Sequence, residues 1–388
     1  MKPSTRVLHA GRHPERYDGA VNTPVVRTST VIARDMTEWD RKHREQASLH
    51  EPALFYGRYG TPTSKALEEA MAELEGGHGA FVFPSGVAAC TAAILAFVET
   101  GDHILVPDSV YGPVRRISGT LLKRFGVTVE FYDPVIGGDI ERVMRPETRL
   151  VYTEAPGSLT FEMQDIPAIA EAAHRRGAIV LCDNTWATPL YFRSFSHGVD
   201  VSIHAATKYV TGHSDAMIGV VTTNEACYRA LKSASQDLGQ IASPDDCYLA
   251  LRGLRTMAIR LERHGRSALA VATWLQSRPE VERVMYPGLP SDPGHALWQR
   301  DFLGASGLLS FTLTQEYAPF RSAFIDRLGL FALGGSWGGF ESLVMPVDPI
   351  RTATDYVTPG AAVRLHVGLE DHEDLFADLE KAFSALQQ

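Results

Sequence analysis

The sequence predicts an α/β protein with a mostly parallel central sheet and a smaller C-terminal α+β domain. Between about residues 61 and 221, short β-rich runs alternate with longer helical stretches, which is the pattern of βαβ units covered on both faces. Most of the short runs are continuously apolar, as parallel strands buried on both faces are expected to be. After residue 246 the pattern changes to a long helical stretch followed by new strand signals.

The strands and covering helices expected in the first part follow from these patterns in chain order. The apolar runs that we assign to strands are residues 81–83, 104–106, 127–131, 150–153, 179–182, 201–204 and 217–222. The stretches with the length and composition of covering helices are residues 64–74, 87–98, 114–125 and 166–175.

One connection breaks the βαβ pattern. Only about a dozen residues separate the strand that ends near His204 from the one that begins near Met217, which leaves little room for a helical crossover. We therefore expect an antiparallel neighbour at this place, with Lys208 in the connecting loop.

The two ends of the chain differ from this central part. The first 58 residues show little periodicity, and we expect an extended arm that can reach across a subunit interface. Residues 248–276 have helical composition, and residues 308–313 and 363–367 are expected strands. The predicted division is therefore an arm at 1–58, a large cofactor-binding domain at 59–250 and a C-terminal domain at 251–388.

Composition and charge are those of an ordinary globular chain. Of 388 residues, 45% are hydrophobic and 21% are charged, and the formal net charge of -9 is spread along the sequence. This argues against a nucleic acid or a membrane surface as the main partner. The N-terminus lacks the apolar core of a signal peptide, and no run approaches the roughly 18 apolar residues of a membrane span. The cysteines show neither metal-type nor disulfide spacing, so we expect a cytoplasmic protein without a metal site.

A lysine and an aspartate lie at the ends of two expected strands. Lys208 follows an apolar strand and Thr207, and an amine at the mouth of a sheet beside a phosphate-binding group suits Schiff-base chemistry with pyridoxal phosphate. Asp183 ends the preceding buried strand, where a carboxylate can face the same crevice and keep the ring nitrogen of that cofactor protonated. Taken alone, Lys208 also fits a surface lysine, and Asp183 a helix cap or a loop residue.

Three further segments supply what such a cofactor needs. The turn into a helix at Gly86 offers free N–H groups to a phosphate, although helix capping also explains it. Tyr111 follows the next strand and can stack on a ring, or can pack as an ordinary tyrosine. Tyr56 and Arg58 can both reach phosphate oxygens, or can lie on the surface.

Near the C-terminus, an arginine and a glycine-dense loop indicate a substrate pocket. Arg364 lies inside a β-like run, where its guanidinium can bind a substrate α-carboxylate or form a structural salt bridge. The loop at residues 334–343 is dense in glycine and contains Trp337, which can form a wall of the pocket.

These motifs closely resemble those of the Cys/Met-metabolism family of pyridoxal-phosphate enzymes. The most specific are Ala206-Thr207-Lys208-Tyr209, with Gly212-His213-Ser214-Asp215, and Ser336-Trp337-Gly338-Gly339-Phe340-Glu341-Ser342-Leu343. The match extends from Tyr56-Gly57-Arg58 to Arg364-Leu365-His366, which is nearly the whole chain. The resemblance implies the aspartate-aminotransferase-like fold (fold type I), pyridoxal 5'-phosphate as cofactor, and a homo-oligomer, usually a tetramer of two intimate dimers.

The resemblance also implies a role for each candidate residue. In the cofactor site, Lys208 resembles the Schiff-base lysine and catalytic base, Asp183 the ring-nitrogen partner, Tyr111 the stacking residue that can assist proton transfer, and Gly86, Val87 and Thr207 the phosphate ligands. Tyr56 and Arg58 would serve the phosphate in the neighbouring subunit. Arg364 with Ser336 would bind the substrate carboxylate, and Trp337 stands where members acting at the β carbon differ from those acting at the γ carbon.

Two positions depart from the family pattern. Many relatives have a serine where this chain has Ala205, so one hydrogen bond to the phosphate is not expected here. Relatives often have Thr-Asn-Pro after a Glu-x-Pro turn, whereas Glu154-Ala155-Pro156 is followed by Gly157-Ser158-Leu159. The asparagine contact to the ring oxygen of the cofactor is therefore not expected.

The expected reaction is β-elimination from an L-amino acid that carries sulfur on its β carbon, with L-cystathionine first, as in trans-sulfuration and methionine biosynthesis. The products would be homocysteine, pyruvate and ammonia. Cysteine desulfhydration and γ-elimination or γ-replacement on the same cofactor remain alternatives, as does a non-catalytic binding protein that keeps the fold. A serine or cysteine hydrolase is disfavoured, because the sequence has no Gly-x-Ser-x-Gly elbow.

Overall fold

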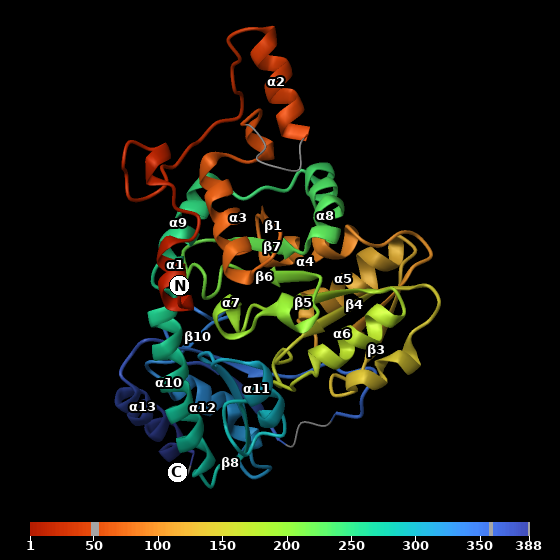
Figure 1. Cartoon of the computed structure of the whole chain (residues 1–388). Helices are drawn as coiled ribbons and strands as arrows, with labels where there is room; N and C mark the ends of the chain where they lie inside the picture. The colour runs from red at the N-terminus through yellow and green to blue at the C-terminus, as the bar shows by residue number, and fades with distance from the viewer. Residues whose placement is uncertain (48–53, 357–359, 387–388) are drawn as a thin grey trace.

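The computed structural model describes residues 1–47, 54–356 and 360–386, and two β-sheets organise this part of the chain (Figure 1). The first sheet has seven strands in the order β1-β7-β6-β5-β4-β2-β3, and the second has five in the order β10-β11-β12-β9-β8. The expected α/β architecture with a mostly parallel central sheet is confirmed. The division at residues 58 and 250 into an arm and two domains stays a prediction.

The strands of the seven-stranded sheet alternate with helices along the chain. They are β1 (Gly79–Phe83), β2 (His103–Pro107), β3 (Thr128–Tyr132), β4 (Thr148–Glu154), β5 (Ile179–Asp183), β6 (Val201–His204) and β7 (Gly219–Thr223). Neighbours among β2 to β6 are parallel, whereas β7 is antiparallel to both β6 and β1. The antiparallel neighbour expected after His204 is therefore confirmed, and Lys208 lies in the connection from β6 to β7.

Helices cover both faces of this sheet, because successive side chains of a strand point to opposite faces. Within β1, Val82 packs in the core with α3, whereas Phe81 and Phe83 pack with α4. The helices of this part are α3 (Pro62–Glu75), α4 (Gly86–Leu95), α5 (Gly112–Ile117), α6 (Ile166–Arg175), α7 (Thr188–Tyr191) and α8 (Glu225–Leu238). The helix expected over residues 114–125 is present, with a π-helical turn at Ser118–Leu122 directly after α5 and α-helical residues again at 123–124.

The five-stranded sheet and its helices form the C-terminal part. Its strands are β8 (Val281–Met285), β9 (Leu308–Leu313), β10 (Ala332–Leu333), β11 (Leu343–Val347) and β12 (Ala362–His366), and its helices are α11 (His295–Asp301), α12 (Arg321–Arg327) and α13 (His372–Ser384). The helical stretch expected over residues 248–276 is present, but it is divided into two helices. Two helices, α9 (Pro244–Leu254) and α10 (Met257–Gln276), meet at a corner where Arg255 Nη1 donates to the carbonyls of Val7 and Ala10 at 2.8 and 2.9 Å.

The N-terminal region is less extended than expected. Helix α1 (Pro3–His9) buries Val7 against α3 and α10, and helix α2 (Met36–Ala47) extends from the top of the molecule in Figure 1. Ion pairs between Arg41 and Glu45 and between Lys42 and Glu38 support α2. A helix supported by such pairs shows little apolar periodicity, which explains why the sequence pattern did not predict it. Residues 48–53 of the predicted arm lie outside the described residues.

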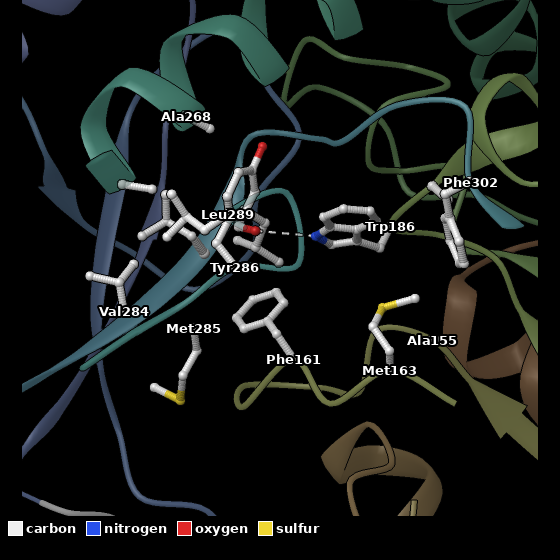
Figure 2. Close-up of a cluster of buried hydrophobic side chains, with 14 of the residues drawn as sticks. Ala155, Phe161, Met163, Trp186, Ala268, Val284, Met285, Tyr286, Leu289 and Phe302 are labelled. Atoms are coloured by element: carbon white, nitrogen blue, oxygen red, sulfur yellow. Dashed lines mark hydrogen bonds between the residues drawn. The ribbon is translucent and has the colours of Figure 1, made fainter. Parts of the chain in front are cut away.

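The two sheets share one hydrophobic core (Figure 2). Trp186, which follows β5, packs with its ring centre 6.4 Å from those of Tyr286 and Phe302. Its indole N–H donates to the carbonyl of Leu308 in β9 at 3.1 Å. The junction between the sheets is therefore packed, which gives a firm floor to the cavity described below. None of the helices in the described ranges is long and apolar enough to cross a membrane.

Candidate active site

A cavity of about 330 Å³ lies where the C-terminal ends of the parallel strands meet the five-stranded sheet. Its volume is in the range of small-molecule sites, and it lies at the sheet edge where open α/β proteins bind ligands. The predicted site residues that line it are Gly86, Val87, Tyr111, Asp183, Thr207, Lys208, Trp337 and Arg364. The structure therefore brings together residues that are far apart in the sequence.

Lys208 lies in the turn after β6, beside Ser336 and Trp337. Its Nζ donates a hydrogen bond to Ser336 Oγ at 2.6 Å and lies 5.3 Å from the centre of the Trp337 ring. Burial and repulsion from Arg364 lower the pKa of Lys208 to about 8, although Asp183 opposes the shift. A useful share of this amine is therefore unprotonated near pH 8, as a nucleophile or a general base requires.

The loop at residues 336–339 is packed directly against Lys208. Ser336 has a φ of 95°, which is costly for a residue other than glycine and persists only where the surroundings hold it. Arg364 Nη2 donates to the Ser336 carbonyl at 2.8 Å and helps to hold it. Gly338 has a φ of 87°, and a Cβ there would lie 3.0 Å from the Lys208 backbone. The loop and the lysine are therefore packed as one unit.

Arg364 presents a guanidinium to the cavity from β12, in the middle of the five-stranded sheet. The residue is 8% exposed, and burial lowers its pKa to about 10, so it stays charged in neutral solution. Among the described residues, none of the ion pairs includes Arg364, which leaves the alternative of a structural salt bridge without support. A buried, charged fork that faces a cavity suits a carboxylate ligand.

Asp183 is a buried carboxylate at the C-terminal end of β5. Its Oδ1 accepts hydrogen bonds from Thr185 N at 3.0 Å and from Thr185 Oγ1 at 2.5 Å, and Cys90 Sγ lies 4.0 Å from Oδ2. Burial raises the pKa of Asp183, although the hydrogen bonds from Thr185 oppose the shift. No cation of the described residues forms an ion pair with Asp183, so a cationic ring nitrogen in the cavity would supply its missing partner.

Glu154 is a site residue that sequence analysis did not select. It lines the cavity at the end of β4, one strand away from Asp183, and its Oε2 accepts from Tyr111 N at 2.8 Å. Burial and then Asp183 raise the pKa of Glu154 well above its ordinary value. The signal that selected Asp183, a carboxylate at the end of a buried strand, applies equally to Glu154. The contact with Glu154 orients Tyr111, which is 38% exposed at the mouth of the cavity.

The N-terminus of α4 faces the cavity with unpaired N–H groups. Ser85 Oγ caps the helix by accepting from Ala88 N at 3.1 Å, and the N–H groups of Gly86 and Val87 have no acceptor within the helix. A Cβ on Gly86 would lie 2.6 Å from Ala205 Cβ, so glycine is what lets the two segments approach. Such a helix end suits a phosphate.

Thr207 also lines the cavity, but its hydroxyl is already engaged. Its Oγ1 donates to the Ile218 carbonyl at 3.2 Å and accepts from Ile218 N at 2.8 Å. The role of Thr207 as a phosphate ligand stays a prediction.

Taken together, the lysine amine, the buried unpaired carboxylate, the helix N-terminus and the tyrosine at the mouth of the cavity fit pyridoxal phosphate.

Tyr56 and Arg58 do not line this cavity. Arg58 lies at a second cavity of about 240 Å³, where its Nη1 donates to the Gln236 carbonyl at 3.1 Å and its Nη2 to Tyr59 OH at 2.9 Å. Tyr56 is 41% exposed and forms an isolated bridge with Thr30. Their role in the site of a neighbouring subunit stays a prediction.

Comparisons with known proteins find similarity over nearly the whole length of the chain. The sequence model of the family described as "Cys/Met metabolism PLP-dependent enzyme" matches residues 4–384. Cystathionine beta-lyase MetC of Escherichia coli strain K12 is 42% identical over 99% of this chain and 99% of its own length. Cystathionine gamma-lyase of Macaca fascicularis is 37% identical over 98% and 93%. A crystal structure of MetB from Corynebacterium glutamicum superposes with a TM-score of 0.91 at 32% identity, covering 100% of this chain and 98% of that one.

Proposed function

The chain belongs to the Cys/Met-metabolism family of pyridoxal-phosphate-dependent enzymes, and we propose that it is a carbon–sulfur lyase that cleaves L-cystathionine by β-elimination. The products are homocysteine, pyruvate and ammonia. The similarity to a cystathionine beta-lyase supports this substrate. The observation that carries the proposal is the contact of the Lys208 amine with Ser336 and Trp337 in a cavity that Arg364 also lines.

Residues at three places in the cavity would hold pyridoxal phosphate. Asp183 would face the ring nitrogen, Gly86 and Val87 the phosphate, and Tyr111 the ring. Bound there, the cofactor supplies a sink for the electron pair that remains on the substrate when its Cα proton leaves.

Lys208 and Arg364 have different roles in the reaction. Arg364 binds the α-carboxylate through its fork of N–H donors and so orients the Cα–H bond. Lys208, whose pKa is lowered to about 8, takes the Cα proton at Nζ. The same Nζ, now protonated, can give a proton to the departing thiolate. The indole of Trp337 lies beside this amine and keeps bulk water away from it.

A pyruvate assay with L-cystathionine tests the proposal. We expect Lys208→Ala to lower the rate by about a thousandfold or more, because it removes the proposed acid and base. The exposed Lys123, changed to alanine, is the matched control and should keep the wild-type rate. A Lys208→Ala variant that releases pyruvate at the wild-type rate would contradict the mechanism, and a wild type without a visible cofactor band would favour the non-catalytic reading.

The similarity to a cystathionine gamma-lyase favours γ-elimination as a second candidate. The two reactions differ in their keto-acid product, because γ-elimination of cystathionine yields 2-oxobutyrate and β-elimination yields pyruvate. Cysteine desulfhydration is distinguished from both of these reactions by supplying L-cysteine and measuring the sulfide that is released.

We also propose that the enzyme is a homo-oligomer, a tetramer of two dimers in which Tyr56 and Arg58 serve the site of a neighbour. Their position outside the cavity of their own chain supports this. A cytoplasmic location is part of the proposal, because the four cysteines are all free and buried, as in proteins of reducing compartments. Cell fractionation checks the location.

A further inference from the structure

The connection between β11 and β12 leaves its own sheet and reaches the other one. Its residues 351–354, here called the strap, contact loops of the seven-stranded sheet. In Figure 1 this connection is the blue segment that extends from the lower sheet towards the yellow part of the molecule. The two strands that it joins line the active-site cavity through Met345 and Arg364.

The first anchor of the strap is Asp108, whose side chain is fully buried just after β2. Its carboxylate accepts hydrogen bonds from the backbone N–H of Thr352 at 3.0 Å, Ala353 at 2.9 Å and Thr354 at 2.9 Å, and from Arg115 Nη2 at 2.6 Å. Burial would raise the pKa of Asp108, but these hydrogen bonds outweigh burial and lower the pKa to about 2. The carboxylate is therefore charged in neutral solution and holds three consecutive strap residues.

The second anchor is Arg351, which is 5% exposed in its side chain. Its Nη2 donates to Glu162 Oε1 at 2.8 Å and also contacts Thr160 Oγ1. Thr160 Oγ1 donates in turn to Glu162 Oε2 at 2.6 Å. The strap is thus bonded to the loop at residues 157–162 as well as to the loop after β2.

Both anchored loops are walls of the cavity. The loop after β2 carries Tyr111, and its Ser109 carbonyl accepts from Ser158 N of the second loop at 2.8 Å. The second loop carries Leu159 and Phe161, which line the cavity and have φ values of 71° and 58°. Residues in such conformations persist only where neighbouring contacts hold them.

We propose that the strap is a positioning element for the active site, in which Asp108 and Arg351 set the spacing of the two cavity walls. Neither residue lines the cavity itself, so both act through the loops that they hold. Because the strap begins shortly after β11, and Met345 of β11 pairs with Arg364 of β12, the same contacts help to fix Arg364 relative to Tyr111. The inference rests on the proposed function for its substrate readout, but not for its cofactor readout.

Loss of an anchor has a recognisable kinetic signature. When the two loops of the cavity are held less firmly, the cavity has its binding-competent arrangement for only a fraction of the time. The apparent dissociation constants of cofactor and substrate therefore both rise by the inverse of that fraction. The rate of the saturated enzyme changes less. A purely structural role would lower the unfolding temperature without this pattern.

The test compares Asp108→Asn with Asp378→Asn in the full-length holoenzyme. Asp378 is a matched control, because its carboxylate accepts from the N–H groups of Gly329 and Leu330 at 2.8 Å each, away from the cavity. We measure the dissociation constant of pyridoxal phosphate from its visible absorption, KM and kcat for L-cystathionine, and Tm.

We expect both variants to lower Tm, and Asp108→Asn alone to raise the cofactor dissociation constant and KM about tenfold with a smaller change in kcat. Equal cofactor constants and equal KM in the two variants would overturn the proposal. The cofactor constant needs no substrate, so it remains decisive even if the wild type fails to cleave cystathionine, which would overturn only the proposed function.

A second variant guards against a failure of Asp108→Asn to fold. Arg351→Gln removes the guanidinium from the second anchor and leaves Asp108 intact. We expect the same joint rise in the cofactor constant and in KM. If Asp108→Asn does not fold, and a folded Arg351→Gln has the wild-type cofactor dissociation constant and the wild-type KM, the proposal is overturned.

Discussion

The surroundings of Lys208 lower its pKa below that of an ordinary lysine. An ordinary lysine has a pKa of about 10.4, whereas burial and the nearby Arg364 lower that of Lys208 to about 8. Only the unprotonated amine attacks an aldehyde. We therefore expect the rate at which the cofactor-free protein takes up pyridoxal phosphate to rise with pH, with a midpoint near 8. Stopped-flow measurement of the visible band against pH checks this.

The comparison variant for this titration is Arg364→Gln. It removes a repelling positive charge, so the midpoint should move to higher pH. A wild-type midpoint above pH 10, or no shift in the variant, would show that Lys208 is solvated like a surface lysine.

At this scale, residue type and position predicted eight of the residues that line the cavity but not their electrostatics. Lys208, Asp183 and Arg364 were found because a charged group at the end of a strand, or within it, is unusual and visible in the sequence. Glu154 has the same signal as Asp183, yet its significance comes from its hydrogen bond to Tyr111 and its place beside Asp183. Such pairings depend on strand order, which periodicity does not determine.

Among the elements, α4 approaches a neighbouring segment closely at its first residue. A Cβ on Gly86 would lie 2.6 Å from Ala205 Cβ and 3.1 Å from Ala205 Cα. We expect Gly86→Ala to push the helix away from the turn that carries Lys208, to destabilise the fold by about 1–3 kcal/mol, and to weaken cofactor binding. Denaturant unfolding and a cofactor titration measure the two effects.

Gly119→Ala is the matched control for that substitution. A Cβ on Gly119 would have nothing within 4 Å, and the residue is exposed in the turn after α5. Alanine there should be neutral or should stabilise by about 0.5–1 kcal/mol. Equal effects of the two substitutions would mean that the approach of α4 to Ala205 is not tight.

Elements with a clear apolar pattern were predicted, and those supported by other forces were not. The parallel strands and α6 follow their apolar runs closely, as do β9 and β12. Helix α2 depends on ion pairs, and the break between α9 and α10 depends on a contact of Arg255 with α1 and the residue after it. Contacts between distant segments leave no local pattern for sequence analysis to find.

At the scale of the whole molecule, the proposed sharing of sites between subunits predicts complementation. Arg58→Ala and Lys208→Ala homo-oligomers should each be nearly inactive. In a mixed dimer, one site would combine Lys208 of one chain with Arg58 of the other, so random mixing should restore about a quarter of the wild-type sites. Pyruvate release after subunit exchange measures this recovery.

The outcome is informative in both directions. Recovery requires that Arg58 act in the site of another chain, whereas no recovery after verified exchange would place its action within its own chain or show that it is dispensable. An equal mixture of Lys208→Ala and wild type gives the reference, because it contains intact sites without complementation.

The two edges of the seven-stranded sheet at which its strands end differ in function. One edge carries the groups of the active site, and the opposite edge tolerates change. Every group assigned to the cavity from this sheet lies at or just after the C-terminal end of β1, β2, β4 or β5, or belongs to the β6–β7 connection. The opposite edge carries turns, such as those at Gly101 and Gly177, where an added Cβ would have nothing within 4 Å. Insertions, fusions or new surface contacts at that edge can therefore accumulate without moving a catalytic group, and the protein can acquire them without a change in its chemistry.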